Sequence, residues 1–331
     1  MRLLTFLDNE TGAPKLGALL ATAPNYVLDI AAATRLAPAT KLTTGIQNAL
    51  AVGDMALLLA NGEAGHDAVK NLIQHAEQEL GKNPATKTLE QADWLRQEAD
   101  LHYLPVVHRP GKIVCVGLNF QSHIDEALAA GQKLPQSVEV PGAFTKVSSA
   151  LLGHRNPIVF PKQGEQLDYE VELALIIGKQ CKNIKAEDYQ QYLAGVSIGV
   201  DLSLRDILFR SPNPFEAKNY DGFCPLGPHL VSLNEAGDPD QLLLQLWVNN
   251  ELRQEESMAN ALFSCGEVLA YWSERMTFEP GDVVLMGTPA GVGIFAEEPS
   301  QRLLKPGDQV KAAIGQLAEL QNDIVATTNG N

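Results

Sequence analysis

The sequence predicts a protein built on antiparallel or mixed β-sheets, preceded by a smaller N-terminal unit. From Pro110 onward, seven short apolar runs follow one another with Pro and Gly between them, and few long helices interrupt them. This pattern is typical of antiparallel or mixed sheets rather than of a doubly wound parallel sheet. The N-terminal part differs, because it combines strand-like segments with a strongly helical one.

Composition limits the classes of function. The chain has 331 residues and 45% of them are hydrophobic, which is enough for one large domain and a small one. Lys and Arg number 25 against 40 Asp and Glu, and the resulting net charge of -15 repels the phosphates of nucleic acids and anionic lipids. We therefore expect neither nucleic acid nor a membrane as a partner.

Cysteine usage and the absence of a targeting pattern predict a location. The four cysteines form no CxxC pair, and no apolar run approaches the roughly 20 residues that a membrane span needs. The N-terminus MRLLTFLDNETG does not have the pattern of a signal peptide. We expect a cytoplasmic protein in a reducing environment.

The N-terminal unit is expected to end near residue 102. MRLLTFL and ALLATAPNYVLDIAAA contain strand-like segments parted by Gly, Pro and Asn, as in a small antiparallel unit. HDAVKNLIQHAEQEL has apolar residues at helical spacing, which predicts a helix with one packed face. The polar stretch 81–102 is interpreted as a connector. The predicted domains are therefore 1–102 and 103–331.

The C-terminal part contains seven predicted strands and one predicted helix. The strands are expected in KIVCVGLNF, NPIVFP, ELALIIG, AGVSIGVDL, LGPHLVSL, LLLQLWVNN and DVVLMG. The helix is expected in NALFSCGEVLAYWSERM, with an apolar stripe formed by Leu262, Cys265, Leu269, Trp272 and Met276. The repeated EPGDVV and KPGDQV predict type II turns, since Pro and Gly suit the two central positions.

The strand DYEVELALIIG carries acids on one face. Alternation with period two places Glu170 and Glu172 on the same side. Either that face is solvated, or the two acids converge with Asp201, which follows another strand-like run. Converging carboxylates about 4 Å apart repel by roughly 4 kcal/mol, and a divalent cation removes that cost. Three oxygen ligands suit Mg²⁺ or Mn²⁺ better than zinc.

The stretch SHIDEA places an imidazole beside carboxylates at an expected helix start. Ser122 is predicted to cap the helix, and His123 and Glu126 lie three residues apart on one face, as in a base with its orienting partner. Ordinary capping and dipole chemistry also explains this pattern.

Further along the chain, Arg205 and Lys218 are candidates for holding an anionic substrate, although Arg205 has Asp206 beside it as an ordinary partner. The loop GTPAGVG offers Thr288 and backbone amides to an anion, without matching a dinucleotide or phosphate-loop signature.

The joint pattern of these motifs resembles the fumarylacetoacetate hydrolase family. IVCVGLNFQSH with HxxE, DYEVELALIIGK, GVSIGVDLSLRD, KNYDGFCPLGP, VNNELRQ and EPGDVVLMGTPAGVG occur in the order and spacing of that family, over about residues 105–320. The resemblance implies an α+β fold, a mixed β-sheet roll with a small N-terminal α/β domain, assembled as a homodimer.

The resemblance also implies a role for each candidate residue. Its metal ligands are Glu170, Glu172 and Asp201 for Mg²⁺ or Mn²⁺, its catalytic residues are His123, Glu126 and Lys218, and its substrate-binding residues are Arg205, Thr288 and Lys146. Two positions depart from the family pattern. Leu208 stands where members often carry Gln, and Phe120 stands where Tyr is commoner, so an amide and a hydroxyl are absent.

The resemblance implies a small-molecule 2-oxo acid as substrate. A cation bound to its carboxylate and keto oxygens would stabilise an enolate. We expect hydrolysis of a C–C bond in an acylpyruvate or fumarylpyruvate-type acid by water that the His123–Glu126 pair activates. Oxaloacetate decarboxylation or keto–enol tautomerisation at the same metal site is the alternative, and a non-catalytic metal-binding scaffold is a third hypothesis.

Overall fold

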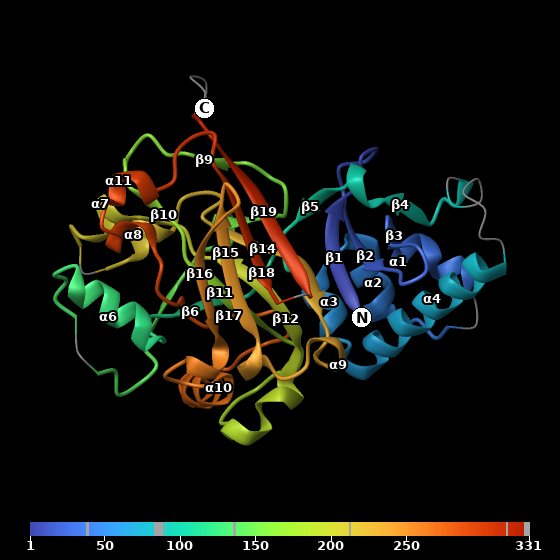
Figure 1. Ribbon diagram of the computed structural model, residues 1–331. Coiled ribbons are helices and arrows are strands. Elements are labelled where there is room, and N and C mark those ends of the chain that lie inside the picture. The colour runs from blue at the N-terminus through green and yellow to red at the C-terminus, as the bar shows by residue number, and fades with distance from the viewer. Residues whose placement is uncertain are drawn as a thin grey trace.

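The seven apolar runs of the C-terminal part all form strands. A computed structural model describes residues 1–37, 40–82, 89, 91–134, 137–211, 213–315 and 317–327. The predicted strands are β6 (Ile113–Val116), β9 (Ile158–Val159), β11 (Val171–Ile177), β12 (Leu193–Val200), β14 (Cys224–Val231), β15 (Leu243–Val248) and β17 (Val283–Leu285). Together with the helices they form the α+β fold with mixed sheets that was expected (Figure 1).

The larger sheet runs through both parts of the chain. Its order is β4-β3-β2-β1-β14-β12-β11-β17-β6-β7, with β5 on β1 and β8 on β14. The strands not yet given are β1 (Arg2–Leu7), β2 (Pro14–Leu19), β3 (Tyr26–Asp29), β4 (Leu95–Gln97), β5 (His102–Leu104), β7 (Ala143–Thr145) and β8 (Leu151–Leu152). Because β1 pairs with β14, the N-terminal strands extend the C-terminal ones. The boundary at 102/103 stays a prediction.

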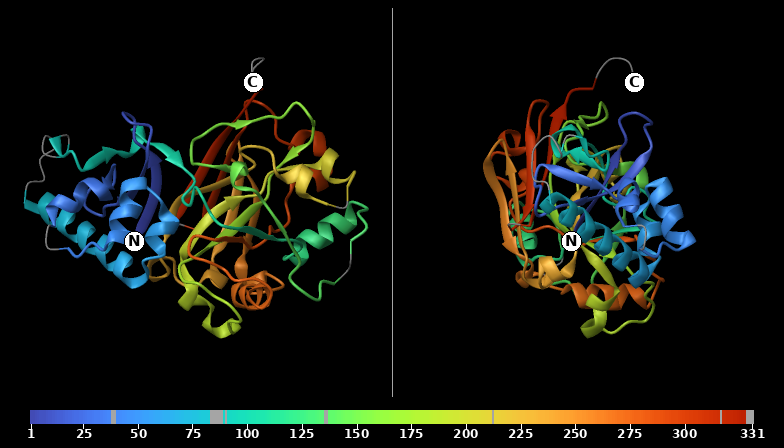
Figure 2. Two further views of the ribbon diagram at one scale, coloured as in Figure 1. Left: turned by 180° about the vertical axis from the view of Figure 1, so that it is seen from behind. Right: turned by 90° about the vertical axis from the view of Figure 1, so that its right-hand side faces the viewer.

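A second sheet covers one face of the first. Its order is β16-β15-β18-β19-β9, where β16 is Glu251–Ser257, β18 is Gln309–Ile314 and β19 is Ala318–Val325. Figure 2 shows the strands of the second sheet layered on those of the first. Between them lies an apolar core to which Leu173, Val196 and Leu244 contribute. A short pair, β10 (Leu167–Asp168) with β13 (Ser203–Leu204), stands apart from both sheets. The second sheet therefore buries side chains at the start of β11.

Helices pack mainly at the two ends of this assembly. The predicted amphipathic helix is α4 (Gly62–Lys82), which buries Val69, Leu72 and Ala76 against the N-terminal strands. The other helices are α1 (Ile30–Ala33), α2 (Thr44–Val52), α3 (Met55–Leu59), α6 (Gln121–Ala129), α7 (Arg205–Leu208), α8 (Phe215–Lys218), α9 (Leu233–Ala236), α10 (Cys265–Ser273) and α11 (Pro299–Arg302). The 3₁₀ segments are η1 (Thr34–Leu36), η2 (Glu98–Asp100), η3 (Ser148–Ala150), η4 (Ala186–Tyr192), η5 (Pro239–Gln241), η6 (Met258–Asn260) and η7 (Gly293–Phe295).

Local sequence signals explain several boundaries. The expected helix around residue 270 is shorter than predicted, because Ser264 and Glu267 form a capping box that starts α10 at Cys265. Both Pro-Gly turns have positive φ at glycine, 89° at Gly281 and 98° at Gly307, as type II turns require. The predicted connector 81–102 contains β4 and η2, and residues 83–88 and 90 of it lie outside the described part.

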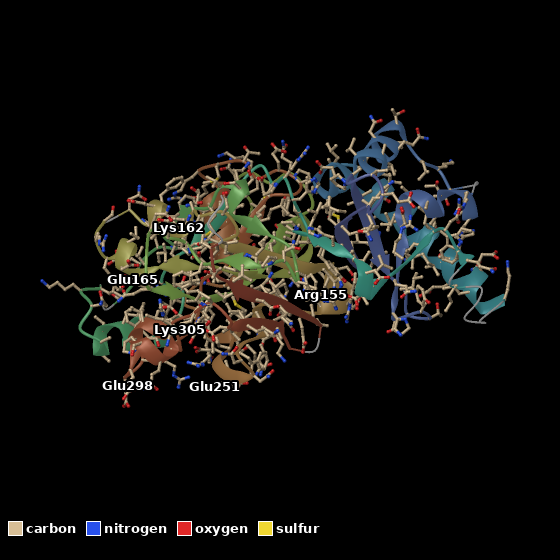
Figure 3. The ribbon with its side chains drawn as sticks, turned by 90° about the horizontal axis from the view of Figure 1, so that it is seen from above. Arg155, Lys162, Glu165, Glu251, Glu298 and Lys305 are labelled. Atoms are coloured by element: carbon tan, nitrogen blue, oxygen red, sulfur yellow. The ribbon has the colours of Figure 1, made fainter. Side chains whose placement is uncertain are left out.

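The two parts of the chain also meet through side chains. Arg155 of the C-terminal part, labelled in Figure 3, lies 3.2 Å from Glu98 of η2, near the end of the N-terminal part. Within the described ranges, no helix has both the length and the apolar character that crossing a membrane requires.

Candidate active site

The acid face of the β11 strand is buried. Glu170 and Glu172 are 6% and 2% exposed, and Asp201, directly after β12, is fully buried. On the opposite face Tyr169, Val171 and Leu173 pack into the core, as the period-two pattern predicts. The alternative of a solvated acid face is therefore wrong, because the neighbouring strands and the loop after β17 cover it.

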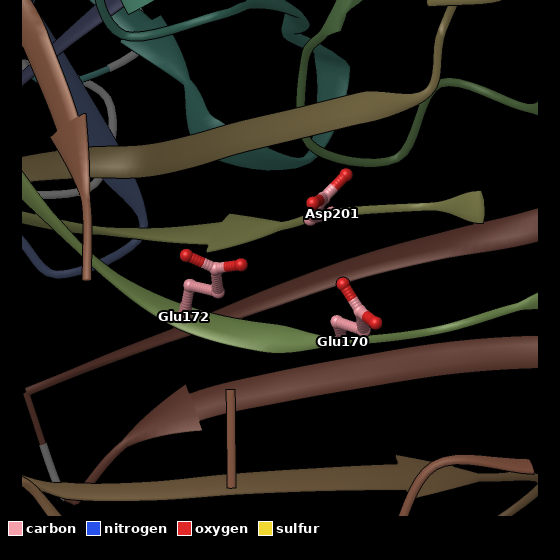
Figure 4. A group of neighbouring side chains, drawn as sticks. All are labelled: Glu170, Glu172 and Asp201. Carbon is pink, nitrogen blue, oxygen red and sulfur yellow. The ribbon is translucent and has the colours of Figure 1, made fainter. Parts of the chain in front are cut away.

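The three acids converge. One carboxylate oxygen from each of Glu170, Glu172 and Asp201 lies within 4.8 Å of the others. Figure 4 shows Glu172 on β11, Glu170 directly before that strand and Asp201 just past the end of β12, with the side chains directed into the same space. Pairing of β11 with β12 sets this arrangement, and the Asp201 amide donates to the Glu170 carbonyl oxygen over 2.8 Å.

Cations compensate two of the three carboxylates. The Lys218 ammonium lies 2.7 Å from Glu170 and 2.6 Å from Asp201. The Arg205 guanidinium lies 2.6 Å from Glu170. Burial opposes ionisation of Glu170, but the charges of Lys218 and Arg205 outweigh it and hold the pKa of that carboxyl well below its usual range. Glu170 is therefore expected in its ionised form, the form in which a carboxylate binds a metal ion.

Glu172 has no such cation beside it among the described residues. Its Oε2 accepts a hydrogen bond from the Gly287 amide over 2.6 Å. Burial, followed by the charges of Asp201 and Glu170, raises the pKa of Glu172 well above its usual range. A divalent cation among the three carboxylates would offset both effects. The donor set of three hard oxygens therefore fits Mg²⁺ or Mn²⁺.

His123 and Glu126 form the expected pair on α6. The His123 Nδ1 lies 2.8 Å from Glu126 Oε1, and the other Glu126 oxygen accepts from the Gly291 amide over 2.8 Å. The pKa of Glu170 is raised by burial and lowered by Lys218, by Arg205 and, to a smaller extent, by His123. The His123–Glu126 pair therefore lies near the carboxylate cluster. The Phe295 ring lies 5.9 Å from the imidazole, between ring centroids.

Ser122 does not cap α6 as predicted. The N-cap position is held by Phe120, and no side chain caps the helix there. The Ser122 hydroxyl instead donates to Glu256 of β16 over 2.5 Å and accepts from the Ala290 amide over 3.3 Å. These long-range bonds tie the start of α6 to the rest of the site, and a local sequence pattern cannot reveal them.

Arg205 and Lys146 are buried cations that each pair with a carboxylate of the cluster. Arg205 binds Asp168 and Glu170 rather than its neighbour Asp206, so the ordinary pairing suggested by sequence is wrong. The Lys146 ammonium is completely buried and lies 2.7 Å from Asp201. Its other bonds are to the carbonyl oxygens of Leu202, Lys218 and Phe223. The direct contact of either residue with a ligand stays a prediction.

Thr288 is brought to the same place by the loop after β17. It is 5% exposed and directly follows Gly287, whose amide bonds Glu172. Its hydroxyl accepts a hydrogen bond from Gln254 over 2.8 Å. The site thus collects residues from β11, β12, α6, α8 and this loop.

Sequence reasoning missed two buried polar residues. Asp168 is fully buried and accepts from Arg205 and from the Gly293 and Ile294 amides. Its position on the same face as Glu170 was a usable signal. Gln254 is 1% exposed, and its sequence surroundings contain no comparable signal.

The α+β fold of two packed sheets thus carries a candidate active site, in which three buried carboxylates that could hold a metal ion adjoin a His–Glu pair. The family of fumarylacetoacetate hydrolase C-terminal domains matches residues 112–325. The chain belongs to the fumarylacetoacetate hydrolase family. Its relatives are enzymes named for tautomerase and hydrolase reactions.

Relatives share both sequence and fold with this chain. The human mitochondrial oxaloacetate tautomerase FAHD2A is 38% identical over 229 residues, covering 69% of this chain and 70% of the relative. The rat counterpart is 36% identical over 261 residues, covering 77% of this chain and 80% of that protein. The solved maleylpyruvate hydrolase of Sphingobium sp. SYK-6, in complex with manganese and pyruvate, is 28% identical with a TM-score of 0.70. That match covers 99% of this chain and all of the other.

Proposed function

We propose that this protein catalyses keto–enol tautomerisation of oxaloacetate or a closely related 2-oxo acid, using Mg²⁺ or Mn²⁺ held by Glu170, Glu172 and Asp201. The observation that carries the proposal is the convergence of these buried carboxylates with a single acid–base pair, His123 and Glu126. The mitochondrial oxaloacetate tautomerases among the relatives support it. Hydrolysis, the first expectation from the sequence, becomes the second candidate.

The chain's own residues supply a proton carrier. Glu126 accepts from His123 Nδ1 in the tautomer that leaves Nε2 free as a base, which can take a proton from the carbon between two carbonyl groups and return it to oxygen. When bound, the divalent cation would supply positive charge at the substrate's carboxylate and keto oxygens. Lys218 adds a second positive charge beside the same carboxylates.

Leu208 favours tautomerisation over hydrolysis. It ends α7, one turn after Arg205, and packs against the core. An apolar side chain there cannot donate to the oxyanion of a tetrahedral intermediate, and losing one such donor costs a hydrolase a factor on the order of 10² to 10³. Tautomerisation forms no tetrahedral intermediate and needs no activated water.

Hydrolysis of an acylpyruvate remains a second candidate for one specific reason. Both Glu126 oxygens are held, one by His123 and one by the Gly291 amide, as a water-activating pair requires. The resemblance in fold to a maleylpyruvate hydrolase also supports it.

We test the two functions with one preparation. Enol oxaloacetate is followed by its ultraviolet absorbance with added Mn²⁺, with a chelator, and with His123→Ala. The matched control is His75→Ala, an exposed histidine on α4. Metal-dependent enol loss without CO₂ release, absent in His123→Ala only, is the expected result.

Other products identify the alternatives. CO₂ release from oxaloacetate would indicate decarboxylation. Acetylpyruvate converted to acetate and pyruvate would indicate hydrolysis. No metal-dependent change in either compound would contradict an enzymatic role and favour a metal-binding scaffold.

The assembly and location are proposals as well. We propose a homodimer that binds a small-molecule 2-oxo acid, for which sedimentation analysis is the test. We also propose a cytoplasmic location, supported by four buried free cysteines. The mitochondrial names of the curated relatives make that organelle the competing location.

A further inference from the structure

Gln254 is a buried amide on β16 to which the proposed chemistry assigns no role. Its Oε1 accepts from the Val171 amide over 3.0 Å. Its Nε2 donates to the Thr288 hydroxyl over 2.8 Å and to the Pro289 carbonyl oxygen over 2.9 Å. One side chain therefore connects the β11 strand with the loop after β17.

Both ends of this bridge lie at the carboxylate cluster. Val171 is the residue between Glu170 and Glu172, so Oε1 holds the backbone that carries both acids. Thr288 follows Gly287, whose amide bonds Glu172. A change at Gln254 is thus transmitted to the site without Gln254 itself touching a carboxylate of the cluster.

The surrounding backbone determines which way the amide points. The Val171 N–H can only donate, and the Pro289 carbonyl can only accept. The carbonyl end of Gln254 must therefore face Val171, and the NH₂ end must face Pro289 and Thr288. The assignment of oxygen and nitrogen follows from these partners.

The amide in turn determines the direction of the Thr288 hydroxyl. An NH₂ group has no acceptor, so the Thr288 oxygen must accept from it. A hydroxyl has a single hydrogen, and this one is left to be donated to another group. A ligand at the carboxylate cluster is a candidate for that group, because Thr288 directly follows Gly287, whose amide bonds Glu172.

We propose that Gln254 is a positioning residue that turns the Thr288 hydroxyl hydrogen toward the carboxylate of a bound 2-oxo acid. The inference rests on the proposed function, together with the substrate-binding role that the family resemblance implies for Thr288. Gln254 thereby strengthens carboxylate binding without contacting the substrate.

The test uses Gln254→Glu, which keeps the size of the side chain, reverses the hydrogen bond to Thr288 and removes the one to the Pro289 carbonyl oxygen. The introduced carboxylate still accepts from Val171, but it also accepts from Thr288, whose hydrogen is then lost to the ligand. Oxalate binding to the full-length, Mn²⁺-loaded protein is measured by calorimetry, and Mn²⁺ binding is measured separately without oxalate. We expect oxalate to bind about tenfold more weakly, the value of one hydrogen bond to a charged group.

Thr288→Val separates this effect from charge. If Gln254 acts through the hydroxyl, Thr288→Val alone weakens oxalate binding about tenfold, and adding Gln254→Glu to it changes binding less than about twofold. Gln74→Glu on the exposed face of α4 controls for added charge. Gln254→Met, which is neutral, should show the same non-additivity if Gln254→Glu folds poorly.

The outcomes are distinguishable. A full tenfold effect of Gln254→Glu in the Thr288→Val background would overturn the inference, because the residue would then act by charge or by folding. Equal oxalate binding in Gln254→Glu and the unchanged protein would overturn it too. Unchanged binding in Thr288→Val would instead reject the proposed role of Thr288, and the inference with it.

Discussion

Lys218→Met tests the electrostatics of the site most directly. The ammonium lies 2.7 Å from Glu170 and 2.6 Å from Asp201, and all three side chains are buried. Methionine keeps much of the length and removes the charge. Two buried carboxylates are then left short of a cation, and breaking a buried pair in this way costs about 3 to 5 kcal/mol.

A divalent cation should restore much of that loss. At about 2 °C per kcal/mol for a chain of this size, the metal-free variant should melt roughly 6 to 10 °C below the unchanged protein. Mn²⁺ at 100 times its dissociation constant adds about 2.7 kcal/mol to any protein that binds it in the folded state. The variant should bind Mn²⁺ more tightly than the unchanged protein, because no ammonium competes for Glu170 and Asp201, so Mn²⁺ should narrow the gap between them.

The assay is thermal unfolding with and without Mn²⁺ after exhaustive chelation. Lys82→Met is the matched control, since Lys82 forms an exposed pair with Glu79 on α4. It should shift the melting temperature by no more than about 1 °C, with or without Mn²⁺. A Lys218→Met protein that loses no stability, or whose deficit Mn²⁺ leaves unchanged, would refute the reasoning that Lys218 and the metal compensate the same charges.

Three further predictions follow from the structure. Glu172→Gln should weaken Mn²⁺ binding, measured by calorimetry, at least 100-fold. The metal-free variant should be as stable as the unchanged protein or more stable, because the raised pKa of Glu172 shows that its negative charge is unfavourable in the metal-free site. A large loss of stability in the metal-free variant would contradict this explanation. Burial, with the charge of Arg2, lowers the pKa of His229 to about 4, so its contribution to stability is present above about pH 6.5 and lost as pH falls toward 4. Between pH 7 and pH 4.5, the loss of stability measured by urea unfolding should therefore be roughly 2 to 3 kcal/mol smaller in His229→Phe than in the unchanged protein, and an equal loss in both proteins would contradict this role of His229. Ser264→Ala breaks the capping box of α10 and should cost about 1 kcal/mol by the same unfolding assay, whereas Ser257→Ala, which caps only the 3₁₀ turn η6, should cost less.

The proposed site would suit more than one reaction. Lys218 and a bound divalent cation would place positive charge where an enolate develops, in tautomerisation as well as in hydrolysis. Hydrolysis would also need a donor to the oxyanion of its tetrahedral intermediate. In this chain the position one turn after Arg205 is the apolar Leu208, and replacing it with Gln is the direct way to ask whether hydrolysis of acetylpyruvate rises.

The sequence by itself determined the features that depend on neighbours along the chain. Period-two alternation correctly placed Glu170 and Glu172 on one face, because a strand points successive side chains to opposite sides. Helical spacing identified α4, and Pro-Gly identified both type II turns, since these depend on local dihedral preferences. The order and spacing of the motifs were enough to indicate the family.

Only the tertiary structure decided which polar groups meet. The acid face of β11 is buried, and Arg205 bonds Asp168 rather than its neighbour Asp206. Ser122 bonds Glu256, which lies 134 positions further along the sequence. The tertiary structure also brought Gln254 to Val171, 83 positions away, and joined the N-terminal strands to the central sheet. No local pattern encodes such partners, because a buried polar group takes whichever donor or acceptor the packing of distant segments leaves beside it.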